Sequence, residues 1–168
     1  VPGDNPEGGV ATPSDLNRTS IVRFSLDRQV EPHQRVVVIV VPGFLAGAAF
    51  NEVLGPALVQ RAAEHGLALE VWSVDRRSNA MEDHRGPHTG DPEVAAAYDQ
   101  EGAEVDGATF AGFKDPPNGL KFMSEWGLRT HVEDVRALVQ RAHEQAAHVF
   151  LGGHSLGASF VEADAAWR

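Results

Sequence analysis

The sequence has no cysteine and no long basic run, and these absences exclude several kinds of site. Without cysteine the chain can form neither a disulfide framework nor a thiolate metal site. The eight histidines form no HExxH motif and no close pair on one helix face, so we expect no metal ion or other cofactor. The net charge is -10 and lysine and arginine nowhere form a patch, which disfavours nucleic acid as a partner.

Long apolar runs are missing as well. The longest, Val36 to Val41, is far shorter than the roughly 20 residues that cross a bilayer, so no membrane span is expected. Residues 1–18 begin with a stretch rich in glycine and proline and are predicted to form a flexible terminus. Because Val1 stands first, removal of an export signal is compatible with the sequence, and we expect a secreted or periplasmic protein.

The remaining residues, 19–168, have the composition of one globular domain. Residues 20–26 alternate between apolar and polar, which predicts a half-buried outer strand. Residues 35–41 are continuously β-branched, as in a central strand that is covered on both faces. A helix over 56–66 and a strand over 67–74 follow, and this order predicts a right-handed parallel crossover.

The pattern is lost between residues 78 and about 120, where only Ala95 to Tyr98 is compatible with a helix. A loop insertion of this length is typical of a binding site. A capping-box spacing at Thr130 then predicts an amphipathic helix to Ala147, followed by a strand over 148–152 and a helix to Arg168. The element order predicts an α/β fold with a doubly wound, mostly parallel sheet.

The pentapeptide Gly153-His154-Ser155-Leu156-Gly157 matches the G-x-S-x-G nucleophile elbow. The motif requires a strand before it and a helix after it, and the residues on either side supply both. Its two glycines allow the strand and the helix to approach closely around a strained serine. The sequence therefore predicts that Ser155 is a nucleophile.

Such a nucleophile needs two backbone N–H groups to bind the oxyanion. Leu156 is the first expected donor, because its N–H lies at the start of the following helix. The second should come from the loop Pro42 to Gly47 after the central strand, where Phe44 is our choice and Leu45 the alternative. The same loop could also be a plain turn of small residues that ends the strand.

With this elbow and this loop, residues 35–168 resemble the first half of the α/β-hydrolase superfamily. Residues 75–83, Asp-Arg-Arg-Ser-Asn-Ala-Met-Glu-Asp, are similar to an arginine- and acid-containing stretch of some bacterial hydrolases. The resemblance implies an α/β-hydrolase fold, incomplete in this chain, and an esterase or lipase activity. A serine at the elbow argues against the branches of the superfamily that use aspartate there.

The superfamily also implies a triad in the order Ser, then Asp or Glu, then His. After Ser155 the sequence contains two acidic residues, Glu162 and Asp164, both on the predicted helix behind the nucleophile, and no histidine. We therefore expect a second polypeptide, made by cleavage near Arg168, to supply the acid and the base. A domain that is truncated, or whose remaining part is missing from this chain, would equally leave the triad incomplete.

The other candidate residues have plainer interpretations. His154, at the variable position of the elbow, is expected to pack locally, and Asp75 to cap a turn. His84 and His88 should be solvated, although they could line the pocket. The remaining histidines that we considered look structural: His131, His143 and His148.

These observations predict a serine hydrolase that cleaves a small-molecule carboxylic ester through an acyl-enzyme on Ser155. Thioesterase and acyltransferase activities use the same chemistry and stay open. A different class of function, a non-catalytic subunit that binds a partner chain through the same fold, is the main alternative.

Overall fold

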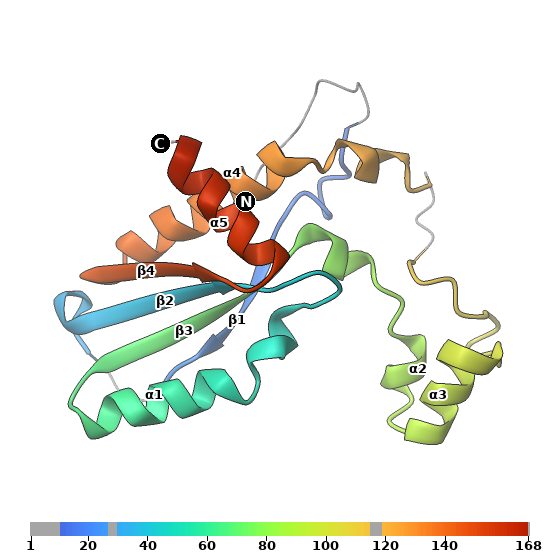
Figure 1. Cartoon of the computed structure of the whole chain (residues 1–168). Helices are drawn as coiled ribbons and strands as arrows, with labels where there is room; N and C mark the ends of the chain where they lie inside the picture. The colour runs from blue at the N-terminus through green and yellow to red at the C-terminus, as the bar shows by residue number, and fades with distance from the viewer. Residues whose placement is uncertain (1–10, 27–29, 115–118, 168) are drawn as a thin grey trace.

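The computed structural model describes residues 11–26, 30–114 and 119–167 and contains a four-stranded, mostly parallel sheet (Figure 1). The strands are β1 (Ser20–Phe24), β2 (Arg35–Val41), β3 (Ala68–Asp75) and β4 (His148–Gly153), in the spatial order β1-β3-β2-β4. β2 pairs in parallel with β3 and with β4, whereas β1 is antiparallel to β3. The predicted α/β class and the mostly parallel sheet are confirmed.

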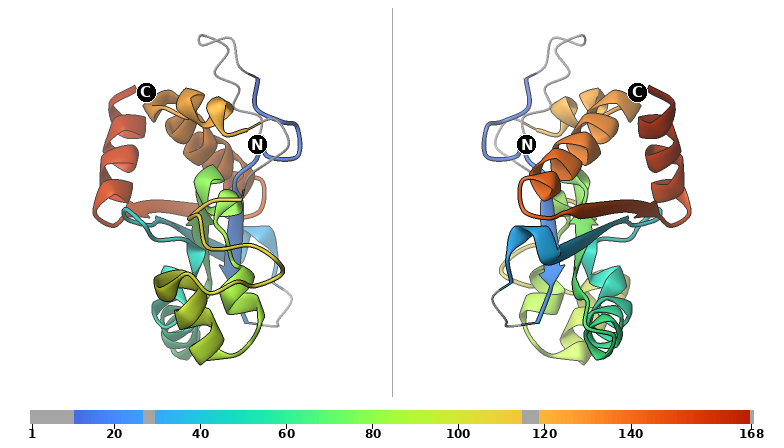
Figure 2. Two further views of the ribbon diagram at one scale, coloured as in Figure 1. Left: turned by 90° about the vertical axis from the view of Figure 1, so that its right-hand side faces the viewer. Right: turned by 90° about the vertical axis from the view of Figure 1, so that its left-hand side faces the viewer.

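Helices cover both faces of this sheet (Figure 2). α1 (Leu54–Glu64) packs against β3 and β1 on one face. α4 (Leu128–His143) and α5 (Leu156–Trp167) pack against β2 and β4 on the other. The main core lies between the sheet and these last two helices, and includes Val37, Ile39, Val41, Trp72, Val135, Leu138, Ala142 and Phe160.

The predicted strands agree with the observed ones to within two residues at each end. The β-branched run over 35–41 coincides with β2, in which Val37, Ile39 and Val41 are buried and the residues between them are half-buried, so both faces of the strand are at least partly covered. Its crossover through α1 to the parallel strand β3 is also confirmed. The helix begins at Leu54, two residues before Pro56, so the proline does not occupy the first helical position.

The segment around residues 78–120 is more structured than expected. It contains α2 (Arg85–His88) and α3 (Pro92–Glu101), which Figure 1 shows to one side of the sheet. α3 begins where the Asp91 carboxylate accepts hydrogen bonds from the N–H groups of Glu93 and Val94, at 2.9 and 3.3 Å. It ends at Gly102, whose φ of 73° is left-handed.

A partly buried ion pair and a buried hydrogen bond join α2, α3 and the residues before them. The Tyr98 hydroxyl donates to Asp83 Oδ2 at 2.6 Å, and Arg85 Nη1 lies 2.7 Å from the same oxygen. The pKa of Asp83 is lowered below its ordinary value, and the hydrogen bond from Tyr98 is the largest cause. The segment is therefore a packed unit rather than an irregular loop.

The capping box predicted at Thr130 does not form. α4 begins at Leu128 after Gly127, and it ends at His143 rather than at Ala147. Thr130 lies inside the first turn, where it is buried and its hydroxyl donates to the Glu125 carbonyl at 3.3 Å. The sequence has the Thr-x-x-Glu spacing of a capping box, but the Thr130 side chain is buried and bonded to Glu125, so it does not cap the helix.

The expected flexible terminus covers residues 1–18, of which 1–10 lie outside the described residues. Within the described part, Thr12 accepts a hydrogen bond from Trp126 Nε1 at 2.9 Å, and Asn17 accepts one from Arg77 Nη1. Leu16 packs against a small apolar cluster formed by Met81, Phe122 and Trp126. This portion is thus held against the body of the domain. Among the helices described, none has the length and apolarity to cross a membrane.

Candidate active site

Ser155 lies at a sharp turn between β4 and α5. Its φ of 53° is in the left-handed region, which residues other than glycine rarely occupy. Two short-range hydrogen bonds close the turn, from Gly157 N to His154 O and from Ala158 N to Ser155 O, both 2.9 Å long. The Ser155 residue is exposed to solvent at the bend. Backbone strain at an exposed serine is the geometry that a nucleophile elbow requires.

The two glycines of the pentapeptide are required by close backbone approach. A Cβ atom at Gly153 would lie 2.4 Å from the Gly157 carbonyl carbon and oxygen. A Cβ atom at Gly157 would lie 2.2 Å from Val41 O and 2.6 Å from Pro42 O. Both distances are far inside van der Waals contact, so no side chain fits at either position.

The loop after β2 meets the elbow at the carboxyl end of the sheet. β2 and β4 are parallel neighbours with Val41 opposite Gly153, and His154 N extends this pairing by donating to Val41 O at 3.0 Å. Gly43 then lies against Ser155, because a Cβ atom there would be 3.1 Å from Ser155 Cβ. Pairing of the two strands therefore brings together the two segments that the sequence predicted to form the site.

The expected oxyanion donors lie in these two segments. Leu156 is the first residue of α5, and N–H groups in the first turn of a helix have no acceptor within the helix. Among the described residues, no acceptor is found for the N–H of Leu156, Phe44 or Leu45. Phe44 and Leu45 are 72% and 84% exposed, so a substrate can reach this loop.

Ser155 has no hydrogen-bonded base in the described part of the chain. Within residues 11–26, 30–114 and 119–167, no histidine or carboxylate is hydrogen-bonded to the Ser155 hydroxyl. His154 stacks on Phe50 with ring centroids 4.9 Å apart, which matches the expected local packing. Asp164 is buried on α5 and bonded to Arg136 Nε at 3.2 Å, and Glu162 is exposed on the same helix.

The remaining histidines lie in other environments. His84 and His88 lie in and next to α2, with their ring centroids 6.0 Å apart. His131 stacks on Phe160 at 4.8 Å, and burial lowers its pKa from the ordinary value, with Asp134 acting in the opposite direction. No group of three or more potential metal ligands exists in the part of the chain that is described.

Two residues at the end of β3 contribute contacts that the sequence did not indicate. The Asp75 carboxylate accepts a hydrogen bond from Ala48 N at 2.5 Å, so it holds the loop after β2 rather than capping its own turn. Arg76 Nη2 donates to Gly43 O at 2.9 Å and to Ala46 O at 3.1 Å. The sequence showed only an Asp-Arg-Arg stretch at the end of a strand, and this stretch does not indicate that its side chains contact a loop about 30 residues earlier in the chain.

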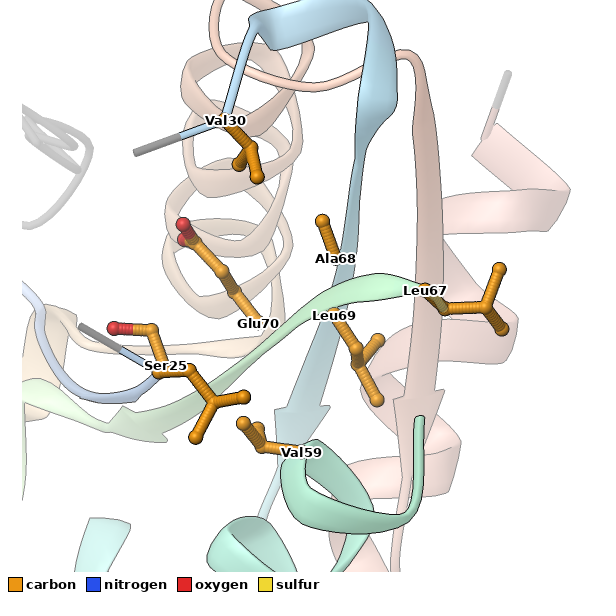
Figure 3. Close-up of a pocket in the computed structure, with 8 residues that line it drawn as sticks. Ser25, Val30, Val59, Leu67, Ala68, Leu69 and Glu70 are labelled. Atoms are coloured by element: carbon orange, nitrogen blue, oxygen red, sulfur yellow. The ribbon is translucent and has the colours of Figure 1, made fainter. Parts of the chain in front are cut away.

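A pocket lies at the start of β3 (Figure 3). Ser155 follows the end of β4, which runs parallel to β2 and β3, so the pocket and Ser155 lie at opposite ends of the sheet. Its one acidic side chain, Glu70, is buried and already satisfied within the fold. Arg23 Nη2 and Arg35 Nε lie 2.5 and 3.0 Å from Glu70 Oε1, and Trp72 Nε1 donates to Oε2 at 3.1 Å. This buried carboxylate is neutralised by the two arginines and belongs to the scaffold.

The carboxyl edge of the sheet thus combines a strained exposed serine, a helix N-terminus and an exposed loop with unpaired N–H groups. These features are defined by backbone geometry and hydrogen bonds within this chain. Comparison of this chain with family models, with curated proteins and with solved structures found no match.

Proposed function

We propose that the protein is a serine hydrolase that cleaves carboxylic esters through an acyl-enzyme on Ser155. The observation that carries the proposal is the left-handed φ of 53° at Ser155, beside a Gly43 backbone so close that a Cβ atom there would lie 3.1 Å from Ser155 Cβ. A strained backbone is retained where the surrounding structure holds it in place, and such sites cluster where chemistry occurs.

In the proposed reaction the Ser155 hydroxyl attacks the ester carbonyl carbon and gives its proton to a histidine base. The N–H groups of Leu156 and Phe44 bind the negative charge that develops on the carbonyl oxygen. The alcohol leaves with the proton that the base returns. Water, deprotonated by the same base, then attacks the acyl-enzyme and releases the acid.

The surroundings of Ser155 favour a substrate with an apolar group. Phe44 and Leu45 project from the adjoining loop, and Phe50, which is 50% exposed, stacks on His154 beside the nucleophile. Apolar side chains left in water next to a reactive group gain by covering an apolar acyl or alcohol chain.

The acid and the base of the triad are proposed to come from a second polypeptide that completes the domain. Among the described strands β4 is the last in the sheet order, so within the described residues its outer edge pairs with no other strand. Phe150 on this strand is 58% exposed. Strand edges with exposed apolar side chains are surfaces onto which another chain can pair. The same edge supports the alternative, a non-catalytic subunit that binds a partner and never uses Ser155.

Labelling with a fluorophosphonate probe separates these two functions. The hydrolase should acquire one adduct, located on Ser155 by peptide mass spectrometry and lost in Ser155→Ala. Ser159→Ala is the matched control, because Ser159 is an exposed serine on α5 outside the elbow. A folded protein that stays unmodified at Ser155, although it is assembled with the second polypeptide that the proposal requires, would rule out the hydrolase in favour of the binding subunit.

Two further measurements refine the result. Intact mass under native and denaturing conditions shows whether a second polypeptide accompanies the chain. An added alcohol or amine diverts product from the free acid at low concentration only if the enzyme is an acyltransferase.

A further inference from the structure

The turn beside the nucleophile is held from outside by one side chain. Ala46 N donates to Gly43 O at 3.3 Å and closes a four-residue turn whose third residue, Leu45, has a left-handed φ of 58°. Turns of this kind usually have glycine at the third position, because other residues are strained there. A leucine in this place requires that contacts elsewhere hold the turn.

Arg76 supplies these contacts at both ends of the turn. Its Nη2 atom donates to Gly43 O at 2.9 Å and to Ala46 O at 3.1 Å. The Arg76 backbone is itself fixed, since its N–H donates to Asn79 Oδ1 at 2.8 Å. A guanidinium bound to a carbonyl oxygen makes a charge-assisted hydrogen bond, which is stronger than a neutral one.

The neighbouring residue Asp75 secures the next part of the same loop. Its carboxylate accepts from Ala48 N, and a Cβ atom at Gly47 would lie 2.8 Å from Asp75 Oδ1. Two consecutive residues at the end of β3 therefore hold the loop between residues 43 and 48. Of these two, Arg76 contacts the part of the loop that adjoins Ser155.

Peptide geometry links the Arg76 contact to the oxyanion donor. The Gly43 carbonyl and the Phe44 N–H belong to one planar peptide unit, and the structure has no cis peptide bond in the described residues. In a trans unit the oxygen and the hydrogen point in opposite directions, so fixing the oxygen fixes the N–H. The Leu45 N–H belongs to the next unit, whose carbonyl is not bonded to Arg76.

We propose that Arg76 is a positioning residue that orients the Phe44 N–H as the second oxyanion donor. This inference rests on the proposed hydrolase function and selects Phe44 over Leu45. Arg76 contacts neither the nucleophile nor the substrate in this role. Its positive charge also polarises the Gly43–Phe44 peptide, which strengthens the N–H as a donor.

The test compares Arg76→Gln and Arg76→Lys with wild type in the full chain together with any polypeptide that copurifies with it. The readouts are the rate of fluorophosphonate labelling at Ser155, and kcat and KM for 4-nitrophenyl butyrate. Rates are expressed per folded molecule, with the folded fraction measured by circular dichroism. Arg61→Gln is the matched control, because Arg61 is an exposed arginine on α1 paired with Glu64.

We expect Arg76→Gln to lower kcat about 10- to 100-fold with KM changed less than about threefold, since an oxyanion donor acts in the transition state. Arg76→Lys should restore a large part of the loss, because an ammonium can still bond a carbonyl of the turn. The pH profile should keep its shape, since no titrating catalytic group is altered. A merely structural arginine would change the folded fraction and leave kcat per folded molecule unchanged.

The outcomes separate the two proposals. An active wild type with an equally active Arg76→Gln overturns the positioning role and leaves the hydrolase intact. A wild type that neither reacts with the probe nor cleaves the ester overturns the hydrolase, and the role of Arg76 falls with it. Equal losses in Arg76→Gln and Arg61→Gln would also count against a specific role.

Discussion

Replacement of Ser155 by glycine should stabilise the fold while it removes the proposed nucleophile. A left-handed backbone costs an L-residue other than glycine about 1–2 kcal/mol, and Ser155 has a φ of 53°. Glycine removes this strain but gains conformational freedom in the unfolded chain, which opposes the effect by about 0.4–1 kcal/mol. The net expectation for Ser155→Gly is a gain of about 1 kcal/mol in the free energy of unfolding.

Ser155→Ala is the reference variant for this experiment. It removes the same hydroxyl but keeps the strain, so its free energy of unfolding should stay close to that of wild type. For a domain of this size, about 1 kcal/mol corresponds to a difference of about 2–4 °C in Tm between the glycine and alanine variants. Urea unfolding followed by circular dichroism measures the free energy, and differential scanning calorimetry measures Tm.

Two control positions test whether the effect comes from backbone conformation. Asp106 has a φ of 51°, so Asp106→Gly should also be stabilising. Ser159 is exposed within α5, where glycine should instead destabilise by about 0.5–1 kcal/mol. If Ser155→Gly is no more stable than Ser155→Ala, or loses stability as Ser159→Gly does, the strained elbow is refuted. The proposal for Ser155 would lose its main support.

Three other perturbations follow from the described contacts. Gly157→Ala places a Cβ atom 2.2 Å from Val41 O. The clash should lower the free energy of unfolding in urea by about 1–3 kcal/mol or more and should slow fluorophosphonate labelling. Unchanged values of both would contradict the close approach. Asp134→Ala leaves the fully buried Arg77 guanidinium without its carboxylate, so it should cost about 3–5 kcal/mol, whereas the double change Arg77→Met with Asp134→Leu should cost less. Burial lowers the pKa of His131, so its stabilising contribution is present above its ordinary pKa near 6.5 and is lost as pH falls through the lowered value. The urea midpoint of wild type should therefore fall more between pH 7.5 and 5 than that of His131→Phe, and equal falls would refute this assignment.

The sequence was sufficient to predict the strands and the elbow because their signals are local. The β-branched run of β2 and the Gly-x-Ser-x-Gly spacing each lie within seven residues. α3 was predicted only in part, at Ala95 to Tyr98, because its apolar side consists mainly of these residues and the hydrophobic period is weak. Its cap signals, Asp91 before Pro92 and Gly102 at the end, were present and would have predicted it.

The contacts of Arg76 could not be predicted in the same way. They join residues 30 and 33 positions apart, and they depend on which strands are neighbours in the sheet. The order β1-β3-β2-β4 is set by packing across the whole domain, which a local pattern does not encode. The missing capping box at Thr130 has a similar cause, since tertiary burial overrides the local preference.

The order of the strands explains why three segments meet at one point. In parallel strands the carboxyl ends lie at the same edge, so the turn after β4, the loop after β2 and the end of β3 come together there. The turn after β4 contains the serine, the loop after β2 contains the proposed second oxyanion donor, and the arginine that holds this loop follows β3. The next residue, Arg77, binds Asp134 on α4 through two hydrogen bonds of 2.6 and 2.7 Å. Consecutive arginines thus fasten the end of β3 to the helix layer and to the loop beside Ser155, so a disturbance of α4 near Asp134 should reach the site through β3.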